Sequence, residues 1–180
     1  MNTYEESLDN ISGDSIRLTP DHLERKSHFF AKSLLVPETE PLSEEAMTTY
    51  WQHVIEASEA LRGLWVSTFR LMGGHGSQVP QKDDSWSAVS HRDALWIVQH
   101  DGATNEPDSE EIVKFVESST KVLQDASKGA RWKSFPSFLD PSFSREQAHK
   151  QYFSEVTLNR LSAFKKKWDP QNIFSNPHSV

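Results

Sequence analysis

The sequence of 180 residues contains no cysteine. This absence excludes disulfide bonds, thiolate nucleophiles and metal sites built on cysteine. Glycine is scarce too, with seven residues in the chain, and none of them forms a phosphate-binding loop of the Walker or dinucleotide-binding type. The chain also lacks an apolar run long enough to cross a bilayer, and its acidic N-terminus lacks the apolar core of a signal peptide. These absences predict a soluble, cytoplasmic protein.

Positively charged residues are fewer than negatively charged ones, 19 against 26, so the net charge is −7. A nucleic-acid groove needs a basic face, so we expect neither nucleic acid nor a membrane as a partner. The basic run at residues 165–167 is interpreted as the solvated end of a helix, where the helix dipole favours cations. The eight histidines show no spacing typical of a helical metal site, so no metal is predicted.

The apolar residues that are present gather in a few segments with clear periodicity. Residues 1–20 are predicted to form a flexible arm and residues 21–180 a single domain. Three segments have the composition of strands, and three have helical periodicity with caps at Ser43 and Ser144. The strands are predicted over residues 28–36, 64–72 and 94–99, and the helices over 43–63, 112–129 and 144–168. This order predicts an α+β fold, in which helices pack on one face of an antiparallel sheet and the open face forms a ligand cavity or a dimer interface.

Five motifs occur in an order that is known from one family. Together they resemble the substrate domain and C-terminal segment of berberine-bridge-enzyme-like FAD-linked oxidases, over about residues 22–180. The motifs are Phe30-Ala31-Lys32-Ser33, Leu71-Met72-Gly73-Gly74, the segment 88–95 around His91-Arg92-Asp93, the segment 135–140, and Asn159-Arg160-Leu161 followed by Lys165, Asp169-Pro170 and Phe174.

The resemblance implies a sheet whose helix-free face lines a substrate cavity and meets a flavin held by a separate, N-terminal domain. This sequence is expected to have no room for that domain, so no cofactor is predicted. Gly73-Gly74-His75 is similar to the family's flavin-attachment stretch, but its place after the second strand favours a glycine turn. The family's Tyr-Tyr-Gly and Asn, which face the flavin, are here Phe153-Ser154-Glu155 and Thr157, and its Tyr-x-Asn-Tyr is here the segment 135–138. These departures predict that the residues that pack the fold are kept, whereas the groups that contact the flavin, and with them the redox activity, are lost.

Polar residues inside the predicted strands are the candidates for a site. Alternation along residues 64–72 places Thr68 and Arg70 on the face away from the helix-packed core. Lys32 and His100 are predicted to join them on this face. The walls of the resulting cavity are predicted to be Phe30, Trp65 and Trp96. The alternative is that Arg70 and Lys32 only solvate an exposed sheet or form salt bridges across a dimer.

Three hypotheses for function follow. The first is a flavin-free enzyme of secondary metabolism that binds an aromatic or polyoxygenated small molecule and catalyses a dehydration, isomerisation or cyclisation, including a Diels-Alder-type cycloaddition. In it, Arg70 and Lys32 hold or polarise an oxygen and His100 is the acid or base. The second is the substrate-domain part of a FAD-dependent oxidoreductase that acts with a separate flavin-bearing chain. The third is a non-catalytic binding module. A homodimer is also expected, because pairing would cover the apolar strand surface once the FAD domain is gone.

Overall fold

The architecture is a three-stranded antiparallel sheet with a helical layer on one face, as seen in a computed structural model that describes residues 28–80, 87–105, 110–127 and 132–180. The predicted arm over residues 1–20 lies outside the described residues. The elements are β1 (His28–Pro37), α3 (Glu44–Ser58), β2 (Leu64–Leu71), β3 (Ala94–Thr104), α4 (Glu110–Ala126), α5 (Arg145–Tyr152) and α6 (Glu155–Trp168). No helix of the described residues is both long and apolar enough to cross a membrane.

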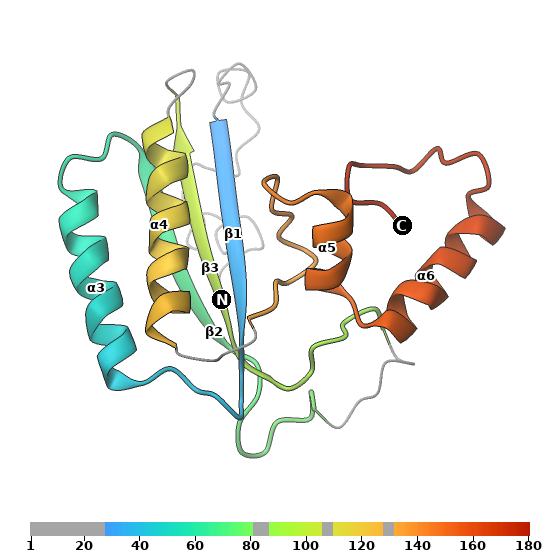
Figure 1. The fold of residues 1–180 in the computed structure, drawn as a ribbon, viewed down its shortest axis with the longest axis horizontal. Coiled ribbons are helices and arrows are strands. Elements are labelled where there is room, and N and C mark those ends of the chain that lie inside the picture. The colour runs from blue at the N-terminus through green and yellow to red at the C-terminus, as the bar shows by residue number, and fades with distance from the viewer. Residues whose placement is uncertain (1–27, 81–86, 106–109, 128–131) are drawn as a thin grey trace, which may run out of the picture.

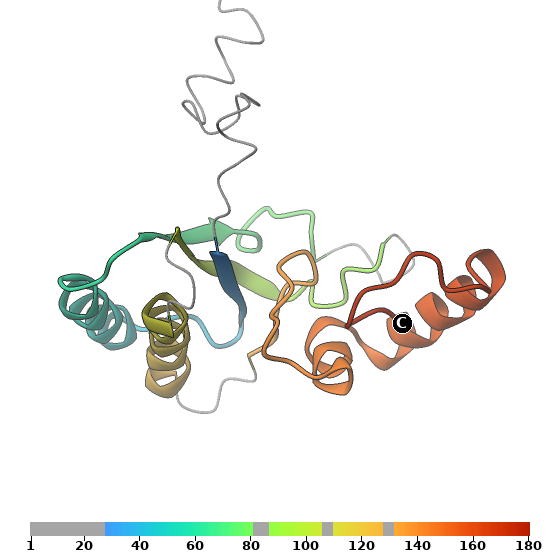
Figure 2. The ribbon, with the colours of Figure 1, turned by 90° about the horizontal axis from the view of Figure 1, so that it is seen from above.

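The strand order is β1-β3-β2, so the last strand in the chain lies in the middle of the sheet. Figures 1 and 2 show α3 and α4 side by side on one face, whereas α5 and α6 lie beyond the β1 edge. The prediction of an α+β fold with an antiparallel sheet is confirmed.

The caps predicted from the sequence form as expected at two helices. The Ser43 hydroxyl accepts a hydrogen bond from the backbone N–H of Ala46 at 3.1 Å, at the start of α3. Ser144 and Gln147 make a reciprocal capping box at the start of α5. The prediction of one helix over residues 144–168 is wrong, because Phe153 and Ser154 are extended and Ser154 caps a new helix, α6. A serine that accepts from the N–H group three residues on competes with helix continuation, which is why the break falls there.

The hydrophobic core lies between the sheet and the α3–α4 layer. Apolar residues at alternate strand positions meet the inward stripe of both helices, which is the expected packing for a two-layer domain. Its buried members are Leu34, Val36, Tyr50, Val54, Val98, Phe115, Val116 and Leu123.

At Gly102 the helix α4 packs directly against the sheet. A Cβ at this position would lie 2.5 Å from Ile112 Cγ1 and 3.0 Å from Val116 Cγ2, so α4 would have to move. We expect Gly102→Ala to lower the free energy of unfolding by about 2 kcal/mol through overpacking. Urea denaturation of the two proteins measures this difference. Ala103→Ser, on the opposite face of the same strand, is the control, and equal stability of Gly102→Ala and wild type would contradict this view of the packing.

The free edge of β1 is joined to the segment that precedes α5. The backbone N–H of Leu35 donates to the Lys133 carbonyl at 2.7 Å, and the N–H of Phe135 donates to Ser33 Oγ at 3.0 Å. Further along, Lys32 Nζ donates to Asp140 Oδ2 at 2.7 Å. These contacts cover an edge strand that would otherwise present unpaired backbone groups, and they attach residues 133–143 to the sheet.

Candidate functional site

The register of the sheet decides which candidates share a face. His100 lies opposite Lys32 on one side and opposite Ser67 on the other. Residues directly opposite in antiparallel strands point to the same face, and this face carries α3 and α4. The prediction that Lys32 and His100 lie with Arg70 on the open face is therefore wrong. Arg70 pairs with Ile97 and Thr68 with Gln99, so these two do lie on the helix-free face, as predicted.

His100 is part of the core. Its ring stacks on Tyr50 of α3 with centroids 5.4 Å apart, and Nδ1 lies 3.0 Å from Thr120 Oγ1 of α4. Because the Thr120 hydroxyl donates to the Val116 carbonyl, the consistent tautomer has Nδ1–H donating to Thr120. Burial lowers the pKa of His100 to about 4. The ring is neutral at pH 7 and the residue is 1% exposed, so it has no route to a substrate on the open face.

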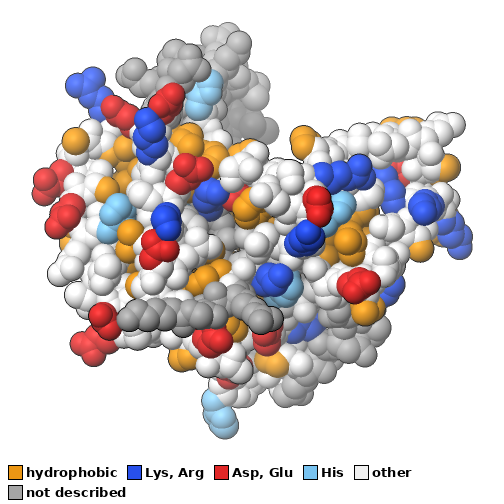
Figure 3. All heavy atoms as spheres, in the orientation of Figure 1, with side chains coloured by type: hydrophobic (Ala, Val, Ile, Leu, Met, Phe, Trp, Pro, Cys, Tyr) orange, Lys and Arg blue, Asp and Glu red, His pale blue; other side chains and the backbone are white. Residues whose placement is uncertain are grey.

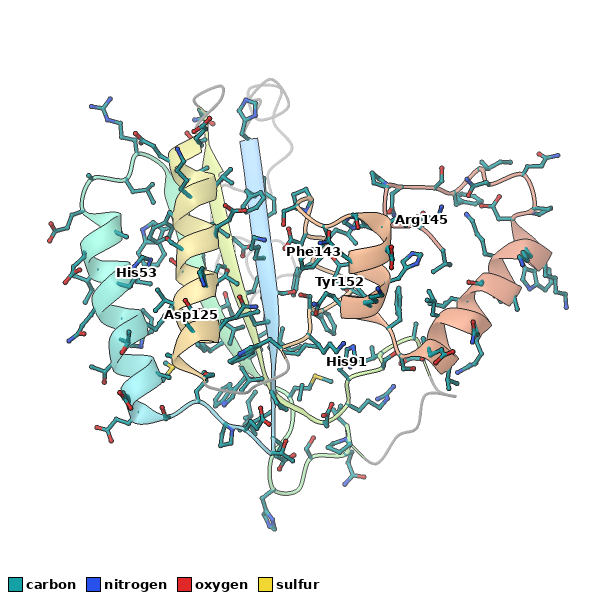
Figure 4. All side chains as sticks on the ribbon, viewed as in Figure 1. His53, His91, Asp125, Phe143, Arg145 and Tyr152 are labelled. Carbon is teal, nitrogen blue, oxygen red and sulfur yellow. The ribbon has the colours of Figure 1, made fainter. Side chains whose placement is uncertain are left out.

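Lys32 is engaged in a buried ion pair. Its ammonium donates to Asp140 Oδ2 at 2.7 Å and to Ser142 Oγ at 2.8 Å. It also lies 5.5 Å from the ring centroid of Phe143, a residue that lies between β1 and α5 in Figure 4. The exposed fractions of the two charged side chains are 13% and 4%. Lys32 thus fastens the C-terminal segment to the sheet.

The three aromatic residues predicted as cavity walls also lie on the helix side. Trp65 packs against Phe115 of α4 with centroids 5.2 Å apart, and Phe30 and Trp96 pack against the same core. The prediction that they wall a cavity with Arg70 is wrong. Large aromatic side chains on strands that alternate in polarity belong to the face that buries them, and here α3 and α4 provide that face.

The open face instead holds a chain of three polar side chains. Arg70 Nη1 donates to Gln99 Oε1 at 2.5 Å, and Gln99 Nε2 donates to both carboxylate oxygens of Asp101 at 2.8 Å. The Arg70 guanidinium lies over the Phe138 ring at 5.5 Å. Sequence reasoning missed Gln99 and Asp101. The signal for them was the alternation of polar residues in β3, which the prediction ended at residue 99 although the strand continues to Thr104.

The family resemblance implies a flavin. At the positions where this sequence departs from the family, few polar side-chain groups are available to contact one. Phe153 has no polar side-chain atom. Ser154 Oγ donates to Thr157 Oγ1 at 3.1 Å and accepts from the Thr157 N–H, so both hydroxyls serve the cap of α6. Thr157 is also buried. These residues do not fit the role of flavin ligands.

The stretch after β2 forms a turn. Gly74 has a φ of 93°, a conformation that glycine adopts without strain. This geometry agrees with the predicted turn. The described residues contain no group of three or more acidic or histidine side chains that could hold a metal ion.

The C-terminal motif folds the tail back onto α6. The Lys165 ammonium contacts both the Asp169 carboxylate and the Phe174 carbonyl. Asp169 also accepts from the N–H groups of Ile173 and Phe174 at 2.8 and 3.0 Å. The Lys165 ammonium, together with these two N–H groups, holds the pKa of Asp169 below its usual value. The tail and α6 line a groove of about 540 Å³, whose walls include the aromatic side chains of Tyr152, Phe153, Phe164, Trp168 and Phe174.

The chain is similar to proteins of known activity. Residues 115–180 match the family model described as berberine and berberine-like. The chain is 28% identical over 166 residues to a carbohydrate oxidase of Microdochium nivale, covering 91% of this chain and 32% of that protein. It is 27% identical over 188 residues to a glucooligosaccharide oxidase of Sarocladium strictum, covering all of this chain and 35% of that protein.

The chain is similar to the berberine-like FAD-linked oxidases, as the resemblance of its motifs predicted. The structural likeness agrees, since the crystal structure of the Microdochium nivale carbohydrate oxidase with a substrate analogue superimposes with a TM-score of 0.69 at 26% identity. That match covers 87% of this chain and 33% of the oxidase. The chain thus spans about a third of the length of the oxidases it matches.

Proposed function

We propose that this chain is the substrate-recognition part of a FAD-linked oxidoreductase whose flavin is held by a unit outside this sequence. Two of its relatives are named carbohydrate oxidase and glucooligosaccharide oxidase, so the proposed substrate is a small, hydroxylated molecule. On the open sheet face, Arg70 and Asp101 supply charged groups that would contact it, and Gln99 between them holds both side chains in place.

The surface of α6 is the observation that carries this proposal. Thr157 is the one buried residue of the helix, whereas Val156, Phe164 and Trp168 are 62%, 64% and 65% exposed. Figure 3 shows Lys and Arg side chains gathered with hydrophobic ones over the part of the molecule formed by α5 and α6. Aromatic side chains exposed together beside an aromatic groove are typical of a surface that meets another protein unit. A flavin-bearing unit is the partner that the relatives suggest.

In the proposed role, substrate binding and electron transfer belong to two different units. This chain binds and orients the substrate through the guanidinium, carboxylate and hydroxyl groups of the open face. A flavin supplied by the other unit would accept the substrate's electrons. No residue of the described chain is assigned to the flavin, because the side chains around Phe153 do not fit it.

Cofactor-free cyclisation remains a prediction without a structural argument in its favour. It needed Arg70, Lys32 and His100 around one cavity, and the sheet separates them. The homodimer also remains a prediction.

Binding of small sugars to the isolated chain tests the proposal. We expect cellobiose, xylobiose or chitobiose to shift the NMR signals of residues 66–70 and 97–101, including the Gln99 side-chain amide, in a saturable manner. Gln99→Met removes the amide while keeping the length of the side chain, and we expect it to weaken binding by about tenfold. Gln52→Met, on the exposed surface of α3, is the matched control. Absence of any saturable shift on the open face, or equal binding by the two variants, would refute the proposed site.

The visible absorption spectrum tests where the flavin is held. We expect the purified chain to be colourless and its titration with FAD to leave the flavin spectrum unchanged. A yellow protein, or tight uptake of FAD, would show that this chain holds the flavin itself, and the division into two units would be abandoned.

A further inference from the structure

Arg70 is the only cationic side chain among the described strand residues of the open face. The other side chains on this face are apolar, hydroxyl or amide groups, except for Asp101. The chain as a whole carries a net charge of −7, so its general field repels anions. The positive charge of Arg70 is therefore a local exception to the negative field of the chain, and it would attract an anion to this face.

Arg70 is held in place by a relay of fixed groups. Asp101 has only acceptor oxygens, so the Gln99 amide must present its nitrogen to Asp101 and its oxygen to Arg70. Gln99 is buried, with 7% of its surface exposed, which restricts its rotamers. The guanidinium carbon of Arg70 lies over the Phe138 ring, 5.5 Å from its centroid. An arginine ordered before binding loses less side-chain entropy when it meets a ligand.

The charge of Arg70 is not matched by a carboxylate. Within the described residues it makes no ion pair, and the amide of Gln99 stands between it and Asp101. The guanidinium has five N–H donors, of which the structure shows one at Nη1 engaged with Gln99. A free edge of a guanidinium matches the two oxygens of a carboxylate in a bidentate pair.

We propose that Arg70 binds the carboxylate of an acidic, hydroxylated small molecule, such as a sugar of the uronic-acid type. This inference rests on the proposed function and names the substrate class of its site. The ring of such a sugar would lie along the apolar surface of Phe138 and Ile97, beside the Thr68 hydroxyl. Asp101 keeps the ligand in one orientation, because it repels a carboxylate placed at its own end of the relay.

Matched ligands separate the charge from the rest of the molecule. The probes are digalacturonate and its dimethyl ester, which has the same rings and no charge, titrated into isotope-labelled protein and followed by NMR. We expect digalacturonate to bind at least about tenfold more tightly than the ester, and increased salt to weaken it selectively.

Variants at Arg70 assign the effect to this residue. Arg70→Gln should weaken digalacturonate by about tenfold or more and leave the ester within about twofold, the loss expected for a charged hydrogen bond. Arg70→Lys keeps the charge without the fork, so its affinity should fall between the two. Arg62→Gln, on the exposed surface, is the control and should bind like wild type.

Two outcomes have different meanings. If the ester and digalacturonate bind the open face equally, and Arg70→Gln changes neither, the carboxylate inference is wrong while the proposed function stands. If neither probe nor any neutral disaccharide binds the open face, both the inference and the proposed function are overturned.

Discussion

Replacing Lys32 with methionine is expected to lower the free energy of unfolding by about 3 kcal/mol, which is typical when one partner of a buried ion pair is removed. Methionine fills a similar volume but leaves the Asp140 carboxylate, whose side chain is 4% exposed, without its cation. Asp140 keeps hydrogen bonds from the Ser142 N–H and hydroxyl, at 2.9 and 2.6 Å. These two bonds do not replace the lost charge.

Urea denaturation of the wild type, of Lys32→Met, of Asp140→Asn and of the double variant measures this effect. Adding Asp140→Asn to Lys32→Met removes the unpaired charge and should restore part of the stability, so the double variant is expected to be more stable than the sum of the two single losses predicts. Lys114→Met is the control, because its ion pair with Glu110 on α4 is exposed and should contribute little. If Lys32→Met loses no more stability than Lys114→Met, Lys32 does not fasten the C-terminal segment.

Acid is expected to destabilise the fold through His100, by about 3 kcal/mol between pH 6.5 and 4. The pKa of His100 is lowered by burial from 6.5 to about 4. In this pH range the unfolded chain takes up a proton at His100 and the folded chain does not, so the free energy of unfolding decreases as the pH falls. Above about pH 7.5 both states are neutral at this residue, and its contribution is constant.

The comparison with His100→Phe isolates this contribution. Phenylalanine keeps the stacking on Tyr50 and has no proton to gain, so the stability of the variant should depend less on pH between 6.5 and 4. Carboxylates elsewhere titrate in both proteins, so the measured quantity is the difference between the two curves of unfolding free energy against pH. Parallel curves would contradict the burial of a neutral His100.

Local structure could be predicted from the sequence because its causes are local. The Ser43 cap and the Ser144–Gln147 box act over three residues, and the strand at residues 64–71 alternates as its side chains alternate. The break at Ser154 had the same kind of signal, a serine followed by glutamate at a helix start. It was missed because the apolar periodicity runs across it.

The site could be predicted only in part, because it depends on pairing between distant segments. Arg70 and Thr68 followed from alternation within one strand. Lys32 was misplaced although it has the same parity as Phe30 and Leu34, which share the helix side of β1. Its ion pair with Asp140 joins residues 108 positions apart, and no local pattern indicates which carboxylate it meets.

The position of β3 in the middle of the sheet has a consequence for the speed of folding. Neither β1 nor β2 has a strand neighbour until residues 94–104 are in place, because β1 and β2 do not pair with each other. The chain must therefore close long loops before the first strand ladder forms, which costs entropy early and gives contacts of large sequence separation. We expect refolding on the slow side for a domain of mixed helices and strands, with α3 and α4 gaining stable structure only when β3 docks between its neighbours.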